Sequence, residues 1–336
     1  MSRRIVRLAA IAGLALAATA GSAHAASDTI KALFPTWPGF APVYVASQMG
    51  YFKAEGLEVI EKFEDDRANV LAAMARGDID VDMRTVGEHQ GRPRDPATPG
   101  VIIGTIDQSL GGDGVVGDAS VKSFADMKGR VFAVEPNIPA RLLAQLELKK
   151  VGLTLADLKV KDIATADSIA VFGDSSVTAV ATYEPYLSQL LKVTGRDHPH
   201  ILVSSKDYPG IITDIITARN EALKQNPAKF AKFLRGIYRA IDLYKTDPAK
   251  YISIAAPHFN LKPEELKEVL DTSLAYTTYE EAIAFVGTKG GKGKLHEVFD
   301  TVMQLNLENG AADHKLDAAQ QIDNSVVTGL FDGHTR

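Results

Sequence analysis

Short apolar runs alternate with helix-like segments along most of the chain. The apolar runs predict strands at residues 29–34, 57–63, 78–83 and 101–106. The segments 42–49 and 68–76 between them have helical patterns, and each is followed by a glycine, which commonly ends a helix. Strands that alternate with helices are typical of βαβ units in a mostly parallel sheet. We therefore expect an α/β fold.

The same alternation begins again after Gly111 and Gly112. It predicts strands at residues 115–116, 130–134, 177–182 and 201–205, and helices at residues 123–127 and 139–150. From Asn220 onward the chain is largely helical. Three prolines in this part stand near expected helix starts, where proline is tolerated: Pro227, Pro248 and Pro263. The pattern predicts two α/β lobes followed by helices.

Two crossings between the lobes are expected. The first is the glycine-rich segment 111–114, because glycines adopt backbone conformations that other residues resist. The second lies near residues 210–214. We therefore expect lobe I to comprise residues 26–110 and 216–336, and lobe II residues 111–215. Two crossings form a hinge, which allows two lobes to close around a ligand.

The first 25 residues have the three parts of a signal peptide. Arg3, Arg4 and Arg7 form a basic start, residues 8–20 an apolar run, and Ala23-His24-Ala25 a small-residue cleavage site. The apolar run is shorter than the roughly 20 residues that a membrane span needs. We expect export to the periplasm and cleavage near Ala25.

Composition narrows the class of protein. The chain of 336 residues has no cysteine, so we expect no disulfide, no cysteine-based zinc site and no lipid-anchored cysteine. Its net charge of −5 becomes −8 when the three leader arginines are removed. An acidic surface argues against nucleic-acid binding, which needs a basic stripe. The length is sufficient for two ordinary domains in one soluble chain.

Several motifs, taken in order, resemble one family. The opening has the patterns Trp37-x-Gly39-x-x-Pro42 and Gly50-Tyr-Phe-Lys-x-Glu-Gly-Leu57. It is similar to the nitrate/sulfonate/taurine group of ABC-transporter substrate-binding proteins, which includes binders of thiamin-pyrimidine precursors. Later segments match in order at residues 76–80, 123–129, 148–153 and 182–186. The resemblance spans residues 29 to about 325.

The resemblance implies a two-lobed periplasmic-binding-protein fold of type II, with the ligand in a cleft between the lobes. It also implies a monomer without enzymatic activity or cofactor that delivers its ligand to an ABC permease in the inner membrane. Segments 109–116, 209–215 and 322–325 resemble the urea/guanidine-type branch. The chain departs from that branch at residues 87–94 and 136–139, both where ligand is expected. We predict a small nitrogen-rich or cationic ligand of the guanidine or urea kind.

An aromatic loop follows the first predicted strand. It holds Trp37, the only tryptophan in the chain, and Phe40. Aromatic faces stack on planar or cationic ligands, and such a contact with a cation contributes roughly 0.5–2 kcal/mol. The alternative is that these rings fold onto the surface of their lobe.

Five acidic residues stand where cleft loops are expected: Glu88, Asp113, Glu135, Glu184 and Asp214. Buried carboxylates are costly unless they are paired or hydrogen-bonded. Several of them in one cleft would suit a cation or an NH-rich ligand. The alternative is that each acid is a helix N-cap, a hydrogen-bond acceptor at the hinge or a surface residue. Thr85, at the end of a predicted strand, is a further candidate ligand contact.

Two arginines favour the opposite ligand charge. Arg84 ends a predicted strand, and Arg141 lies in the first turn of a predicted helix, where free N–H groups already favour anions. If these arginines face the cleft, the ligand is a sulfonate, taurine or a nitrate-like anion, which arginine holds with two hydrogen bonds. The alternative is that they pair with the acids. His198 and His200 have no third ligand nearby in the sequence, so we expect no metal site.

Enzyme motifs are absent from the sequence. It contains no G-x-S-x-G, Walker A or H-E-x-x-H pattern. Its one G-x-G-x-x-G, at residues 112–117, leads into a predicted strand rather than a helix, so we interpret it as a hinge. A pyrimidine-synthesising enzyme shares the fold, but its cysteine-rich motif cannot exist in a chain without cysteine.

Overall fold

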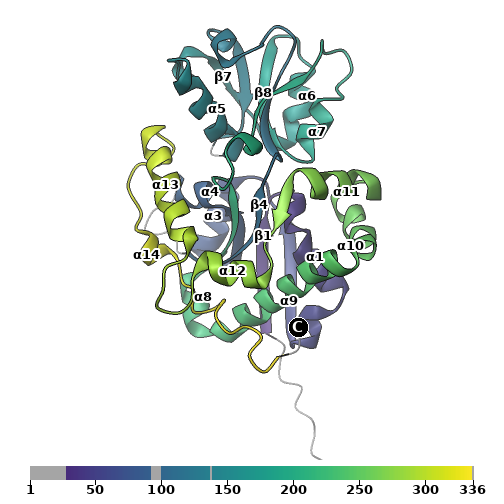
Figure 1. The fold of residues 1–336 in the computed structure, drawn as a ribbon, viewed down its shortest axis with the longest axis vertical. Coiled ribbons are helices and arrows are strands. Elements are labelled where there is room, and N and C mark those ends of the chain that lie inside the picture. Colours follow the sequence, from purple (N-terminus) through teal and green to yellow (C-terminus); the bar gives the residue numbers. More distant parts are fainter. Residues whose placement is uncertain (1–27, 92–99, 137, 335–336) are drawn as a thin grey trace, which may run out of the picture.

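The computed structural model describes residues 28–91, 100–136 and 138–334. Within them the chain forms two β-sheets, each flanked by helices, at opposite ends of the long axis (Figure 1). The predicted α/β architecture of two lobes is confirmed. The expected signal peptide lies outside the described residues, as do residues 92–94 of the segment that departs from the urea/guanidine-type branch.

Lobe I is the part built on a six-stranded sheet of order β11-β4-β10-β3-β1-β2. Its strands are β1 (Asp28–Phe34), β2 (Leu57–Phe63), β3 (Val81–Thr85), β4 (Val101–Ser109), β10 (Thr213–Ala218) and β11 (Leu274–Tyr276). Its helices are α1 (Ala41–Gln48), α2 (Tyr51–Ala54), α3 (Arg67–Arg76), α4 (Val86–Gln90), α8 (Asn220–Gln225), α9 (Pro227–Thr246), α10 (Pro248–Ala255), α11 (Pro263–Thr272), α12 (Tyr279–Val286), α13 (Lys294–Glu308) and α14 (Ala318–Gln321).

Lobe II is the part built on a five-stranded sheet of order β7-β6-β8-β5-β9. Its strands are β5 (Asp113–Gly117), β6 (Val131–Val134), β7 (Lys159–Asp162), β8 (Val177–Tyr183) and β9 (His200–Ser204). Its α-helices are α5 (Pro139–Lys150), α6 (Ser168–Phe172) and α7 (Tyr186–Leu190). The helix expected at residues 123–127 is a 3-10 turn, Phe124–Met127.

The sheets are mixed, whereas the alternation of strands and helices predicts mostly parallel ones. β1 runs parallel to β2 and β3, but β10 is antiparallel to both of its neighbours. In lobe II, β5 is antiparallel to β8 and β9. β5 and β10 are the strands that the chain enters directly from the other lobe. Without a helical crossover to reverse its path, such a strand runs against its neighbours.

The long helix α9 shows how the sequence directs the core. Asn226 caps its start by accepting a hydrogen bond from the Lys229 amide at 3.2 Å, and Pro227 occupies its first turn. Apolar side chains at helical spacing form one buried face, which includes Phe230, Phe233, Leu234, Ile237 and Ile241. That face packs on α1 and β1. The C-terminal helices therefore complete lobe I rather than form a third unit.

The two crossings lie side by side. The first is residues 110–112, between β4 and β5, and the second runs from the end of β9 to Thr213. The hydroxyl of Ser205 in the second crossing lies 2.8 Å from the hydroxyl of Ser109 and accepts a hydrogen bond from the Gly111 amide at 2.6 Å. All of β10 pairs within the sheet of lobe I. The lobe boundary expected between residues 215 and 216 therefore falls inside a strand.

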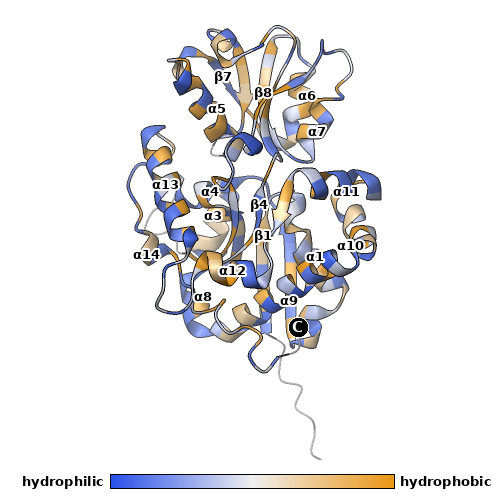
Figure 2. Ribbon diagram, viewed as in Figure 1, coloured by the Kyte–Doolittle hydropathy of each residue, from blue (hydrophilic) through white to orange (hydrophobic). Residues whose placement is uncertain are grey.

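Hydropathy follows this architecture. Figure 2 shows hydrophobic residues along the strands of both sheets and hydrophilic ones along outer helices such as α11. Among the described residues, no helix combines the length and the apolar character needed to span a membrane.

Candidate ligand site

A pocket of about 290 Å³ lies between the two lobes, beside the crossings. Both lobes contribute to its wall, which is formed by Pro35, Trp37, Phe40, Thr85, Glu88, Asp113, Pro139, Tyr183 and Asp214. Six of the nine residues predicted from the sequence are therefore brought together: Trp37, Phe40, Thr85, Glu88, Asp113 and Asp214. The other three, Glu135, Arg141 and Glu184, do not line this pocket.

Sheet topology explains why these residues meet. Pro35, Trp37 and Thr85 stand at or after the carboxyl ends of β1 and β3, where ligands of α/β sheets bind. Asp113 and Asp214 lie at the amino ends of β5 and β10. Because those two strands are antiparallel to their neighbours, their amino ends reach the same edge.

Trp37 lies inside the cleft rather than on a lobe surface. Its side chain is only 4% exposed, and its indole Nε1 donates to both carboxylate oxygens of Asp107 at 3.3 Å. Its ring meets the ring of Tyr183 edge-on, with 6.4 Å between centroids. Gly39 and Gly112 pass so close to Trp37 that a Cβ at either would overlap it. Trp37 is therefore fixed in place as one wall of the pocket.

Three aspartates form the acidic floor of the site. Asp107 and Asp214 are direct cross-strand partners on β4 and β10, and Asp113 begins β5. All three are buried, with at most 4% exposure. Burial raises the pKa of Asp107 and that of Asp113 to about 7. It also raises the pKa of Asp214 well above its ordinary value, and the negative charges of Asp107 and Asp113 raise that pKa further.

The charge of this floor is not balanced by a nearby cation. Among the described residues, no Lys, Arg or His forms an ion pair with Asp107, Asp113 or Asp214. The hydrogen bonds that lower the pKa of Asp107 and Asp113 come from Trp37, Asp214 and Ser109. Buried carboxyl groups in such surroundings either keep their protons or bind a cation.

Glu88 differs from the aspartates because it has a cationic partner. Its Oε1 lies 3.2 Å from Arg84 Nη1, and its Oε2 accepts from the Thr85 amide and hydroxyl at 3.1 and 2.9 Å. Thr85 in turn accepts from the Glu88 amide, which completes a capping box at the start of α4. Glu88 is thus both a helix cap and a wall of the pocket.

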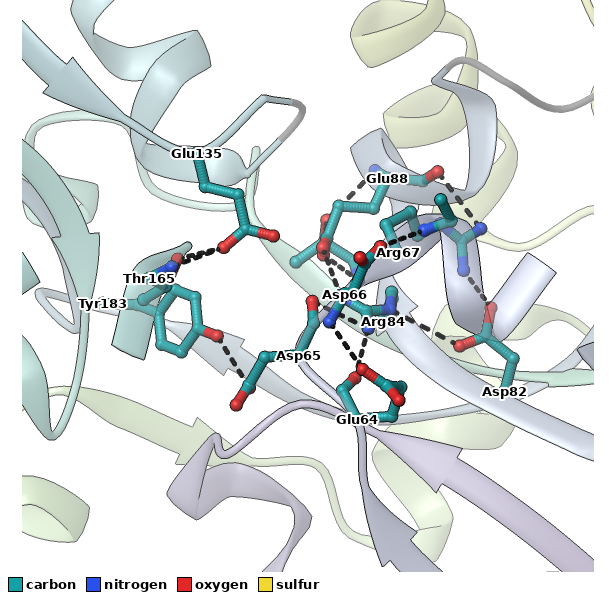
Figure 3. Close-up of polar contacts among 12 residues, drawn as sticks. Glu64, Asp65, Asp66, Arg67, Asp82, Arg84, Glu88, Glu135, Thr165 and Tyr183 are labelled. Atoms are coloured by element: carbon teal, nitrogen blue, oxygen red, sulfur yellow. Dashed lines mark hydrogen bonds and ion pairs between the residues drawn. The ribbon is translucent and has the colours of Figure 1, made fainter. Parts of the chain in front are cut away.

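Arg84 is held by groups of lobe I. Besides Glu88, its guanidinium lies 3.7 Å from Asp82 and donates to the backbone oxygens of Glu64 and Asp65 (Figure 3). Asp82 also pairs with the buried Arg67. Burial alone would lower the pKa of Arg84, but the attraction of Glu88 and Asp82 outweighs it and the pKa is raised. Arg84 therefore pairs with acidic residues, which was the expected alternative to a role in anion binding.

Arg141 lies beside the pocket. It lines an adjoining space of about 420 Å³ that shares Thr85, Glu88 and Pro139 with the pocket. Its side chain is 24% exposed, and Nη1 lies 3.4 Å from Asp162. Of the two candidate anion anchors, Arg141 is the one that retains access to the cleft.

Glu135 and Glu184 are held by their own lobe. Glu135 accepts hydrogen bonds from the amide and hydroxyl of Thr165 and lines a separate opening that Asp65 also lines (Figure 3). Glu184 accepts from Ser188 Oγ at 2.7 Å and does not line the pocket. Burial raises the pKa of both carboxyl groups.

The prediction from the sequence did not include four residues of the site: Pro35, Asp107, Pro139 and Tyr183. Asp107 follows the apolar run 101–106 directly, so an acid at a strand end was visible in the sequence. Tyr183 was visible in the same way after the run 177–182. The two prolines carried no signal, because only the approach of the lobes brings Pro139 to the pocket.

The lobes also touch each other on both sides of the pocket. Tyr183 of lobe II donates to Asp65 of lobe I at 3.1 Å. On the other side, the Gln145 amide donates to the Asn309 carbonyl at 3.0 Å, and Lys149 pairs with Glu308 at 2.9 Å. The two lobes are therefore in contact on either side of the pocket in the described conformation. No group of three potential metal ligands occurs among the described residues.

Comparison with known proteins identifies the family of this chain. The NMT1/THI5-like family matches residues 37–251, more than half of the chain. The chain belongs to that family. A binding protein of Brucella abortus is 22% identical over 238 residues, which are 70% of this chain and 73% of that protein. A 4-amino-5-hydroxymethyl-2-methylpyrimidine phosphate synthase of Aspergillus parasiticus is 25% identical over 305 residues, 84% of this chain and 86% of its own.

Solved structures share the fold of this NMT1/THI5-like protein. The alkanesulfonate-binding protein SsuA of Xanthomonas axonopodis pv. citri, bound to MOPS, superposes with a TM-score of 0.71 at 14% identity, over 88% of this chain and 98% of that one. The periplasmic nitrate-binding protein NrtA of Synechocystis PCC 6803 also gives 0.71 at 14% identity, over 91% and 87%. The expected periplasmic-binding-protein fold is confirmed.

Proposed function

We propose that this NMT1/THI5-like protein is the periplasmic solute-binding component of an ABC importer. The observation that carries the proposal is a pocket that both lobes wall and that lies beside the two crossings. In such an arrangement, ligand contacts stabilise the closed conformation, which a permease in the inner membrane can recognise. Structural neighbours with the same fold are named as periplasmic binding proteins for sulfonate and nitrate.

For the ligand, we infer a small nitrogen-rich or cationic compound of the guanidine or urea kind. Asp113 and Asp214 face the pocket, and the rings of Trp37 and Tyr183 form its sides. A planar cation fits this combination, because it stacks on aromatic rings and donates charge-assisted hydrogen bonds to carboxylates. The resemblance of segments 109–116 and 209–215 to the urea/guanidine-type branch supports the same class.

A sulfonate, taurine or nitrate-like anion is the second candidate. The names of the structural neighbours favour this class, and Arg141 lines the adjoining space. For an anion to bind beside Asp113 and Asp214, both carboxyl groups would have to hold their protons and act as donors. The two candidates therefore differ in pH dependence: cation binding strengthens as pH rises, and anion binding weakens.

A thermal-shift panel tests the ligand class. The protein without residues 1–25 would be unfolded and refolded to remove carried-over ligand. It would then be heated with guanidine, urea, simple amines, taurine, alkylsulfonates, nitrate or a thiamin-pyrimidine precursor. A ligand at 100 times its dissociation constant adds about 2.7 kcal/mol to stability. We expect a shift with guanidine or amines that persists in Arg141→Ala and is lost in Asp214→Asn.

The opposite pattern would overturn the cationic assignment. A shift with taurine or nitrate that Arg141→Ala abolishes would make the second candidate correct. Chemical conversion of any of these compounds during incubation would contradict a binding protein, because a binding protein returns its ligand unchanged. The enzymatic relative makes that check worthwhile.

A further inference from the structure

We propose that Asp107 and Asp214 share one proton in the ligand-free protein and release it to the solvent when a cationic ligand binds. This proposal rests on the proposed cationic ligand. It assigns Asp107, which does not line the pocket, a role in setting the charge that the pocket accepts. The site would then exchange one positive charge for another rather than gain a net charge.

The geometry of the pair favours a shared proton. Asp107 and Asp214 are opposite one another on antiparallel strands, both are buried, and each alters the pKa of the other. Two carboxylates have only acceptor oxygens, so a hydrogen bond between them exists only if one carries a proton. Their exposures of 0% and 4% leave little room for water to separate them. Like charges this close in a buried site do not both ionise.

The groups around the pair increase its need for a proton. Glu88 on α4 faces it, as does Asp113 on β5, which adds negative charge once it ionises, and Tyr251 and Tyr276 lie near Asp107 as neutral phenols. The buried cation of this region, Arg84, is paired with Glu88. The indole N–H of Trp37 is donated to Asp107. Among the described residues, the shared proton is therefore what compensates the charge of this pair. The raised pKa of Asp107 agrees with this.

A cation in the pocket removes that need. Asp214 faces the pocket, so a guanidinium or ammonium group beside it favours the carboxylate form. The O–H bond of the protonated carboxyl breaks, its proton passes to water or buffer, and both aspartates become carboxylates. A neutral or anionic ligand gives no such compensation. If one proton leaves per ligand, affinity for the cation rises by up to about tenfold per pH unit below the apparent pKa of the pair.

Trp37 reports on the pair without any ligand. It is the only tryptophan of the chain, and its indole N–H contacts both oxygens of Asp107. We expect its emission in the ligand-free, leaderless protein to change between pH 5 and pH 9. Asp107→Asn should abolish this change, because the indole N–H then contacts an amide that does not titrate. Asp214→Asn is a second variant should the first fail to fold. Exposed Asp300→Asn is the matched control and should titrate like the parent protein.

Calorimetry tests the coupling. Guanidinium chloride would be titrated at pH 6.5 in phosphate and in Tris, whose ionisation enthalpies differ. We expect Asp107→Asn to release about one proton fewer per bound guanidinium than the parent protein, because any proton that Asp113 releases is common to both. Emission that does not change with pH would overturn the shared proton whatever the ligand is. Emission that titrates while the two proteins release equal numbers of protons on guanidinium addition would overturn the coupling. The thermal-shift panel then shows whether the ion failed to bind, which would contradict the proposed ligand class instead.

Discussion

Asp113 makes stability of the ligand-free protein depend on pH. Its carboxyl group is buried at the start of β5, beside Glu88 and Asp107, and burial raises its pKa from 3.8 to about 7. The folded protein therefore holds a proton that the unfolded chain releases above pH 4. Because the folded state binds more protons, its free energy of unfolding falls as pH rises from about 4 through about 7.

The size of this effect follows from the pKa difference. At 1.36 kcal/mol per pH unit, raising the pKa from 3.8 to about 7 costs the folded protein about 4 kcal/mol once the group is ionised. About 3 kcal/mol of that cost appears between pH 5 and pH 8. Asp113→Asn keeps the shape of the side chain and removes its titration. We expect the variant to gain stability over the parent protein as pH rises.

The assay is urea denaturation followed by circular dichroism at several pH values from 5 to 8, on refolded protein free of ligand. The difference in free energy of unfolding between Asp113→Asn and the parent should grow with pH by about 3 kcal/mol. Asp300→Asn, on the exposed face of α13, should stay parallel to the parent. If the curves for Asp113→Asn and the parent are also parallel, the surroundings of the buried carboxyl group compensate its charge and its pKa is not raised.

Three further substitutions test the packing around the site. Arg84→Ala leaves buried carboxylates without their partner and should cost roughly 3–5 kcal/mol in urea denaturation, and a loss below about 1 kcal/mol would contradict the network. Gly39→Ala places a methyl group against Trp37, so it should lower stability by about 1–3 kcal/mol and shift the indole emission; an unchanged spectrum would count against this contact. Tyr183→Phe removes the donor to Asp65 and should weaken ligand binding about fivefold by calorimetry, at about 1 kcal/mol per hydrogen bond, and equal affinity would show that this contact does not hold the lobes together.

Much of the lobe architecture could be predicted because it depends on local patterns. Apolar runs mark the strands, and Asn226 followed by Pro227 marks the start of α9. Strand ends were less predictable. Gly77 ends α3 in a left-handed conformation and a turn follows, so β3 starts at Val81 rather than at residue 78 and reaches Thr85. That shift is not visible in hydropathy alone.

The site likewise has a part that the sequence predicts and a part that it does not. Acids near strand ends, such as Asp113 and Asp214, could be placed from the sequence because sheet edges collect them. Whether a charged group has a partner could not be predicted from the sequence. Glu88 is compensated by Arg84 and Asp214 is not, because the cross-strand register, and not residue spacing, puts Asp107 opposite Asp214. Pairing of this kind between distant segments determines the charge of the pocket.

The position of the two aspartates next to the crossings has a mechanical consequence. Asp113 follows Gly112 directly, and Asp214 is the second residue of the returning strand, so a ligand in the proposed site would bind close to the pivot between the lobes. A small rotation at the pivot moves the outer ends of α5 and α13 through a much longer arc, in proportion to their distance from it. A ligand of a few atoms would thus control a displacement much larger than itself, and the contact between Lys149 of α5 and Glu308 of α13 would depend on that displacement.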